Sequence, residues 1–204
     1  MFPAQVSAIL ERLEQAGFAA YAVGGCVRDT LLGRVPQDWD VATSARPEQT
    51  AALFAGRSIP TGLQHGTVTV RQEGLSVEVT TFRADGPYSD HRRPDAVYFS
   101  DSLAEDLCRR DLTVNAMAMD RRGVLTDLHG GREDLRRGLL RCVGEPDRRF
   151  DEDALRIMRT LRFASVLGFT VEERTAAALH RCAPLLGSIA AERLLSEMDR
   201  LLCG

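Results

Sequence analysis

The chain has 204 residues, of which 44% are hydrophobic and 27% charged, a composition typical of one domain with a buried core plus a smaller second unit. No apolar run reaches the about 20 residues that cross a bilayer, and Glu11 and Glu14 stand where a signal peptide would be basic and then apolar, which excludes a membrane partner and predicts a cytoplasmic protein. The formal net charge of −3 argues against bulk attraction to nucleic acid, although all 26 basic residues are arginines, whose planar fork suits phosphates and base edges.

The first hundred residues alternate between helix-like and strand-like patterns. Apolar residues at helical spacing predict a helix over residues 3–16, which ends at Gly17. In order there follow a buried strand in "FAAYAVGG", a short helix in "CVRDTLLGR", a strand in "DWDVAT", a helix in "RPEQTAALFAG", and two strands joined by a Glu-Gly turn in "GTVTVRQEGLSVEVTTF". Strands interleaved with helices predict an α/β head with a sheet of mixed direction.

The balance shifts toward helix after residue 100. The stretch "SLAEDLCRRDLTVNAMAMD" has apolar residues at helix-like positions (Leu103, Leu107, Leu112, Val114 and Met117), and "GVLTDLHGG" indicates a strand and a turn. From residue 144 onward almost everything indicates helix, with breaks near Gly168 and at Pro184. We therefore expect two domains, an α/β head over residues 1–140 and an all-helical neck over residues 141–204.

The cysteines are few and scattered. They are Cys26, Cys108, Cys142, Cys182 and Cys203, and the sequence contains no C-x-x-C pair. An odd number of widely separated cysteines favours neither a zinc site nor a disulfide framework. We expect reduced thiols in the core.

Three carboxylates in strand-like segments indicate a metal site. Residues i and i+2 of a strand share a face, so Asp38 and Asp40 project together while Trp39 turns into the packing. In "LSVEVTTF", Glu78 lies on the face opposite the valines and is a candidate third carboxylate. Such a trio can hold two Mg²⁺ ions for nucleotidyl transfer. The alternatives are a solvated turn for the aspartates and an ordinary half-exposed strand for Glu78.

The glycine pair Gly24-Gly25 lies between a predicted strand and a predicted helix that starts near Val27. Glycines allow a ligand to approach the backbone closely, and the N–H groups of the helix start together with Arg28 could bind a triphosphate beside the aspartates. The alternative is a tight turn without a ligand.

A second polar cluster lies in "EDALRIMRTLR". Its polar residues are three apart, which on a helix makes one slowly rotating stripe of Asp153, Arg156, Arg159 and Arg162, while Leu155, Ile157, Met158 and Leu161 pack elsewhere. A carboxylate accepts from an exocyclic amine and an arginine fork donates to a ring nitrogen and a carbonyl, so the stripe could read cytosine and adenine. The alternative is a solvated charged face.

These motifs together resemble a known family. The segment "GGCVRDTLLGRVPQDWDVAT" is similar to the signature of class II tRNA nucleotidyltransferases and bacterial poly(A) polymerases, a branch of the polymerase beta superfamily. The resemblance continues in the same order through "VEVTTFRADGPYSDHRRPDAVYF", "RRDLTVNAMAMD" and "EPDRRFDEDALRIMRTLRFASVLGF". It implies a polymerase-beta-like palm and a helical neck, and an enzyme that adds CCA from CTP and ATP to the 3′ end of tRNA with Mg²⁺.

The resemblance also implies roles for individual residues. Asp38 and Asp40 would bind metal, with Glu78 as third acidic residue. The residues that would contact or support the nucleotide are Gly24, Gly25, Arg28, Arg110, Asp111, Asn115, Asp153, Arg156, Arg159 and Arg162, with Asp111 and Asn115 supporting Arg110, and Asp153 with Arg156 imitating Watson-Crick partners. Residues 84–96, including Arg92 and Arg93, resemble the flexible loop that helps the switch from C to A addition, or form an ordinary surface loop.

Other activities stay open on the same residues. Within the family these are A addition alone and poly(A) synthesis, whose enzymes often have proline where this chain has Ala154. The chain also stops at "ERLLSEMDRLLCG", whereas family members normally continue into domains that hold tRNA. A nucleotide-binding module with little turnover is therefore a further alternative.

Overall fold

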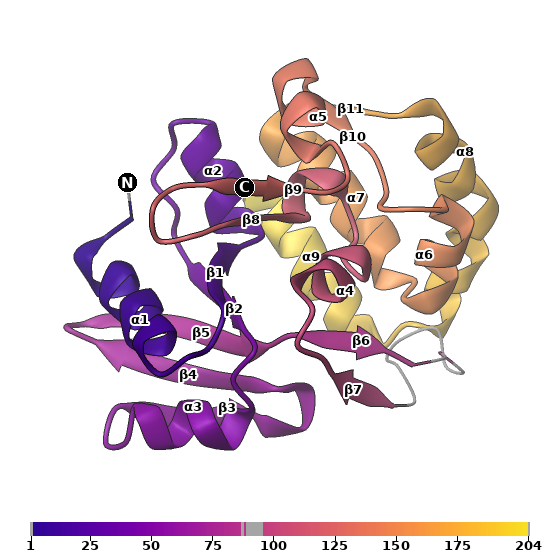
Figure 1. Cartoon of the computed structure of the whole chain (residues 1–204). Coiled ribbons are helices and arrows are strands. Elements are labelled where there is room, and N and C mark those ends of the chain that lie inside the picture. The colour runs from indigo at the N-terminus through magenta and orange to yellow at the C-terminus, as the bar shows by residue number, and fades with distance from the viewer. Residues whose placement is uncertain (1, 87, 89–95, 204) are drawn as a thin grey trace. The chain divides into compact units, whose positions relative to one another are not determined.

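The computed structural model describes residues 2–86, 88 and 96–203 (Figure 1). The chain divides into two units. Unit 1 contains Met1–Ala84, Val97–Arg109 and Asn115–Leu128, and unit 2 contains Asp85–Ala96, Arg110–Val114 and His129–Gly204. The α/β fold followed by a helical region is confirmed, while the predicted domain boundary at residue 140 stays a prediction.

A seven-stranded mixed sheet forms the centre of unit 1. Its strand order is β3-β4-β5-β2-β1-β8-β9, with β2 and β5 parallel and the other neighbours antiparallel. The bounds are β1 Ala20–Val23, β2 Trp39–Thr43, β3 Ser58–Gly62, β4 Thr67–Gln72, β5 Leu75–Thr81, β8 Met117–Met119 and β9 Leu125–Asp127. A separate pair consists of β6 Arg83–Asp85 and β7 Val97–Phe99.

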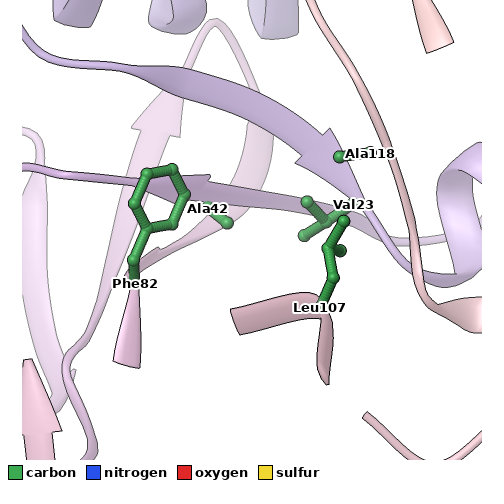
Figure 2. Packing of buried hydrophobic residues seen from close by; sticks show 5 residues of the cluster. All are labelled: Val23, Ala42, Phe82, Leu107 and Ala118. Carbon is green, nitrogen blue, oxygen red and sulfur yellow. The ribbon is translucent and has the colours of Figure 1, made fainter. Parts of the chain in front are cut away.

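Four helices belong to this unit: α1 Ala4–Gln15, α2 Gly25–Leu31, α3 Pro47–Leu53 and α4 Leu103–Cys108, with a short 3-10 turn at Leu63–His65. The buried residues of α1 are Val6, Ile9, Leu10 and Leu13, the four that the helical spacing predicted. Across the sheet, Figure 2 shows Val23, Ala42, Phe82, Leu107 and Ala118 in one buried cluster, so residues from β1, β2, β8 and α4 share a core.

The predicted Glu-Gly turn joins β4 to β5. Gln72 is in register with Leu75, which leaves Glu73 and Gly74 as a two-residue loop with φ values of 47° and 83°. Positive φ at both central positions is the geometry that matches the twist of a hairpin, and glycine adopts it without steric strain.

The predicted helix over "SLAEDLCRRDLTVNAMAMD" is wrong beyond its first turns. After α4 the chain forms a 3-10 turn at Thr113–Asn115 and then β8, which lies between β1 and β9. Every residue from 111 to 119 is buried. Within this stretch β8 reads Met-Ala-Met, a short apolar run that fits a strand buried on both faces, whereas an amphipathic helix exposes one face.

Unit 2 is mostly helical. Its elements are α5 Gly131–Arg137, β10 Leu139–Leu140, α6 Pro146–Glu152, α7 Leu155–Leu167, β11 Thr170–Val171, α8 Glu173–Cys182, a 3-10 segment at Ala183–Ser188 and α9 Ala191–Cys203. The strands β10 and β11, which the sequence analysis did not predict, pair in parallel. The break at Gly168 is confirmed, with a φ of 69° at the end of α7, and the predicted break at Pro184 falls in the 3-10 segment.

The cysteines are free thiols, as predicted, but not all lie in the core. Cys26 and Cys142 are buried and Cys182 is half-buried, while Cys108 and Cys203 are exposed. Both exposed cysteines are the last residues of their helices, α4 and α9. Within the residues that the structure describes, no helix is long and apolar enough to cross a membrane.

Candidate active site

The sheet register brings two of the predicted catalytic carboxylates together. Asp40 of β2 stands directly opposite Glu78 of the parallel strand β5. Partners in register have side chains on the same sheet face, and Glu78 is exposed while Asp40 is half-buried. The neighbouring pairs, Trp39 with Val77 and Val41 with Val79, are buried on the other face.

Asp38 lies one residue before β2 begins and is exposed. The residue between the aspartates, Trp39, is buried and meets the ring of Phe2 edge-on at a centroid distance of 5.6 Å. Among the described residues, no group of three His, Cys, Asp or Glu side chains is gathered closely enough to hold a metal ion. Asp38 thus lies just before β2, while Asp40 and Glu78 face each other within the paired strands β2 and β5.

The glycine pair sits at the start of α2, which begins at Gly25 and thus two residues earlier than predicted. Gly24 has φ 77° and ψ −133°, a conformation that only glycine adopts without strain, and its N–H donates to the carbonyl of Met117 at 3.2 Å. A side chain at Gly25 would approach Nη2 of Arg28 to 3.7 Å. That distance is an ordinary van der Waals contact, so the backbone conformation requires glycine at position 24 but the available space does not require it at position 25.

Arg28 is buried and its guanidinium is fixed on two sides. Nε and Nη2 donate to the two carboxylate oxygens of Asp29 at 2.8 and 3.0 Å. Nη1 donates to Oδ1 of Asn115 at 2.8 Å, across 87 residues of sequence. The family resemblance implies that Asn115 supports Arg110, and in the structure its side-chain oxygen holds Arg28. No sequence pattern predicts this hydrogen bond, because the two residues lie 87 positions apart.

Asp111 is also held within the protein. Its Oδ2 accepts from Nε and Nη2 of Arg159 at 2.8 and 2.7 Å, and its Oδ1 accepts from the N–H of Leu112. Burial by itself would raise the pKa of the Asp111 carboxyl, but the Arg159 guanidinium outweighs it and lowers that pKa below its usual range. The neighbouring Arg110 is half-buried.

Asp153 does not lie within the predicted helix. It occupies the break between α6 and α7, with extended backbone at φ −142°. Its Oδ1 accepts from the N–H of Leu155 at 3.1 Å, and Oδ2 lies 3.4 Å from Nη2 of Arg193. Burial raises the pKa of the Asp153 carboxyl. The carboxylate thus satisfies an N–H group at the start of α7.

The three arginines of the stripe lie on α7, and the solvated alternative is wrong for them because each is buried or half-buried. Arg156 donates to Oε2 of Glu152 at 2.9 Å, and Arg162 donates to Oε2 of Glu197 at 2.7 Å. Of the apolar residues predicted to pack, Leu161 is exposed and Phe163 is buried in its place. Neither partner, Glu152 or Glu197, is predicted from the sequence pattern. The spacing of four residues between Glu152 and Arg156 is a signal for their ion pair, since residues four apart are neighbours on a helix surface.

The predicted loop at 84–96 falls largely outside the described residues, Arg92 and Arg93 included. Of its described part, the hydroxyl of Tyr88 donates to Oδ2 of Asp85 at 2.7 Å, and the N–H of Gly86 donates to the carbonyl of Ala96 at 2.9 Å. Burial, together with the Asp85 carboxylate, raises the pKa of Tyr88 above its usual range.

Comparison with known proteins identifies the family. A family model described as "Poly A polymerase head domain" matches residues 20–141, which contain the glycine pair, the three carboxylates and Arg110. The chain belongs to this family. A second model, described as "Probable RNA and SrmB- binding site of polymerase A", matches residues 168–204. Membership in the poly(A) polymerase head family, predicted from the sequence motifs, is thereby confirmed.

Relatives within this family are named CCA-adding enzymes. The enzyme of Geobacillus kaustophilus (strain HTA426) is 52% identical over 98% of this chain and 49% of its own length. A crystal structure of the Bacillus stearothermophilus CCA-adding enzyme in complex with CTP matches with a TM-score of 0.92 at 48% identity, over 100% of this chain and 50% of that chain. The Thermotoga maritima CCA-adding enzyme complexed with tRNA matches with a TM-score of 0.80 at 25% identity, over 98% of this chain and 48% of that chain. The chain spans about half the length of these relatives.

Proposed function

We propose that this chain catalyses template-independent nucleotidyl transfer from CTP and ATP to the 3′ end of tRNA, the CCA addition for which its relatives are named. The observation that carries the proposal is the strand register, which places Asp40 of β2 opposite Glu78 of β5. Asp38 lies two residues before Asp40, and the Gly24 turn follows the neighbouring strand β1. Membership in the head-domain family supports the same chemistry. A cytoplasmic location, where tRNA and nucleoside triphosphates occur together, belongs to this proposal.

The carboxylates fit Mg²⁺ as the cofactor. They offer only oxygen atoms, which this hard cation prefers, and two or three protein ligands are enough when substrate phosphates and water complete an octahedron. Asp38 and Asp40 would hold the metal, with Glu78 as the third acidic residue. When bound, Mg²⁺ would neutralise charge on the reacting phosphate and lower the pKa of the attacking hydroxyl.

The protein residues supply binding and orientation. The Gly24 turn, whose backbone conformation glycine adopts without strain, would lie against the triphosphate, and the guanidinium of Arg28, oriented by Asp29 and Asn115, would bind its negative charge. Arg110 and the arginines of α7 extend the set of nucleotide contacts. Asp153 would accept from the exocyclic amine that cytosine and adenine share, while Arg156 would donate to the adjacent ring nitrogen of either base.

The division of the chain follows the same proposal. We assign transfer chemistry to a head over residues 1–140 and base recognition to a neck over residues 141–204. The alternatives of A addition or poly(A) synthesis receive less support, because the relatives about 52% identical to this chain are named CCA-adding enzymes. A nucleotide-binding module with little turnover stays as the second candidate, since the match spans half of each relative.

Incubation with a tRNA that lacks its last three nucleotides tests the proposal. With labelled CTP we expect two additions, and with CTP and ATP together one further A. A single A on a tRNA that already ends in CC, without C addition, would assign A addition instead, and a ladder of A residues would assign poly(A) synthesis. CTP binding without any incorporation would favour the nucleotide-binding module. UTP and GTP serve as controls and should not be incorporated.

A further inference from the structure

Each of the three arginines on α7 makes an ion pair with a carboxylate from a different segment of unit 2. The pairs are Arg156 with Glu152 at 2.9 Å, Arg159 with Asp111 at 2.7 Å and Arg162 with Glu197 at 2.7 Å. The first two carboxylates lie in motifs that the sequence analysis already singled out. Glu197 belongs to no such motif and comes from α9, 35 residues after its partner.

Glu197 is placed by packing as well as by charge. Its side chain is 7% exposed and that of Arg162 is 14% exposed, so both charges are largely removed from water. One turn earlier on the same face of α9, Leu194 packs against the buried cluster of Ala154, Leu155 and Ile189. The apolar contact anchors the helix, and the anchored helix fixes the position of the carboxylate.

The contact occupies one side of the guanidinium and leaves the end of the fork for another ligand. Oε2 of Glu197 accepts from Nε of Arg162, and the guanidinium carbon lies 4.2 Å from the ring centroid of Phe163. Neither interaction uses the two Nη groups, which are the donors that bind phosphate or carbonyl oxygens in pairs. An arginine held at Nε and against a ring is oriented before its ligand arrives.

We propose that Glu197 is a positioning residue for nucleotide binding: from α9 it holds the guanidinium of Arg162 in the orientation that the nucleotide requires. The inference rests on the proposed function, which assigns Arg162 to the nucleotide. The inference goes beyond the proposed function because Glu197 lies in the 168–204 segment that matches the RNA-binding family model. Nucleotide affinity then depends on a helix from that segment.

The energetics of buried ion pairs support a role in orientation. Desolvation offsets most of the attraction between two buried charges, so such a pair adds little net stability. A charge-assisted hydrogen bond nevertheless fixes the donor more strongly than a neutral one. Glu197→Gln keeps the size of the side chain and an oxygen that can accept from Nε, but removes the charge. We expect this variant to fold and to bind CTP and ATP about five- to tenfold more weakly.

A double-mutant cycle measured by isothermal titration calorimetry with CTP and ATP tests the proposal. The variants are Glu197→Gln, Arg162→Ala and their combination, with Glu192→Gln as a matched control because Glu192 is exposed on the same helix. If Glu197 acts through Arg162, its substitution weakens binding in the wild-type background and has no further effect once Arg162 is alanine. The control variant should bind like wild type.

The outcomes separate the possible failures. Wild-type protein that binds neither CTP nor ATP overturns the proposed function and this inference with it. If the wild-type protein binds and Glu197→Gln binds with the same Kd, the inference alone is overturned. The same holds if Glu197→Gln weakens nucleotide binding equally with Arg162 and with alanine at position 162. A purely structural role would lower the unfolding temperature and leave the Kd of the folded protein unchanged. Should Glu197→Gln fail to fold, Glu197→Asp, which keeps the charge and withdraws the carboxylate, decides by the same criteria.

Discussion

Asp40 is the residue on which the proposed chemistry depends most, because it is in register with Glu78 and two residues from Asp38. Asp40→Asn keeps the volume of the side chain and removes the charge that a metal ion requires. We expect CMP incorporation to fall about 10³-fold or more, since metal ligation supplies several kcal/mol of transition-state stabilisation. The measurement is single-turnover incorporation on a tRNA that lacks its CCA end.

The unfolding temperature should stay within a few degrees of wild type, because Asp40 is only half-buried and asparagine fills the same volume. Asp101→Asn provides the control, since it makes the same chemical change at an exposed aspartate of unit 1. Incorporation at the wild-type rate by folded Asp40→Asn would show that the metal ligands lie elsewhere.

Arg156 tests base recognition. Arg156→Lys keeps a positive charge for the buried Glu152, which also pairs with Arg148 and Arg149, so the fold should persist. Lysine lacks the planar fork, and a bidentate contact to a base is worth about 1–3 kcal/mol of discrimination. We expect the preference for CTP over UTP to fall about tenfold or more in competition assays. Unchanged selection against both UTP and GTP would remove Arg156 from this role.

The thiols provide a prediction that does not depend on function. Burial raises the pKa of Cys26 to about 11 and that of Cys142 to about 12, so at pH 8 only about one molecule in 10³ or fewer carries the reactive thiolate there. A disulfide reagent should therefore modify the exposed Cys108 and Cys203 first. The rapid phase of thiol modification should disappear in the Cys108→Ser, Cys203→Ser double variant. Rapid reaction of all five thiols in the native protein would contradict the burial of Cys26 and Cys142.

At the scale of elements, the break between α6 and α7 gives Asp153 two tasks. The carboxylate accepts from the N–H of Leu155 and, in the proposed function, from the amine of the base. Asparagine accepts from a backbone N–H about as well as aspartate does, but its amide also donates. We expect Asp153→Asn to shift the unfolding temperature by only about 1–4 °C while weakening CTP and ATP binding about tenfold.

Thermal unfolding and nucleotide titration on the same preparation separate the two tasks. Asp153→Ala is the matched comparison, because it removes both and should cost stability as well as affinity. If Asp153→Asn binds both nucleotides as tightly as wild type, the carboxylate serves the helix start alone.

At the scale of the whole molecule, charge bears on RNA affinity. Residues 1–103 contain 9 arginines against 12 acidic residues, and residues 104–204 contain 17 against 17, so neither part has a strong positive excess. Affinity for nucleic acid comes mostly from summed phosphate contacts and falls steeply with salt. We expect this chain to bind CTP and ATP but to hold tRNA weakly, with a Kd above about 10⁻⁶ M at physiological salt.

Filter binding over a series of salt concentrations measures this affinity, with nucleotide binding on the same sample as proof that the protein is folded. Tight, saturable binding of tRNA by these 204 residues would place the RNA-holding surface within them.

Local patterns were enough to predict elements whose form depends on near neighbours. The four buried positions of α1, the alternation of β4 and β5 and the Glu73-Gly74 turn all follow from helical spacing, side-chain alternation and backbone sterics. The family signature allowed the candidate site residues to be named before any geometry was known. These features share one physical cause, because each is determined within about ten residues of sequence.

Tertiary structure alone decided the partners that lie far apart in the chain. The segment 111–119 became a 3-10 turn and strand β8 because β1 and β9 pair with β8 on both sides, and β3 formed as an exposed edge through pairing with β4. Asn115 holds Arg28, and Glu197 holds Arg162, across 87 and 35 residues. Periodicity carries no information on such pairs, since a buried charge is stabilised by whichever partner the fold brings within hydrogen-bonding distance.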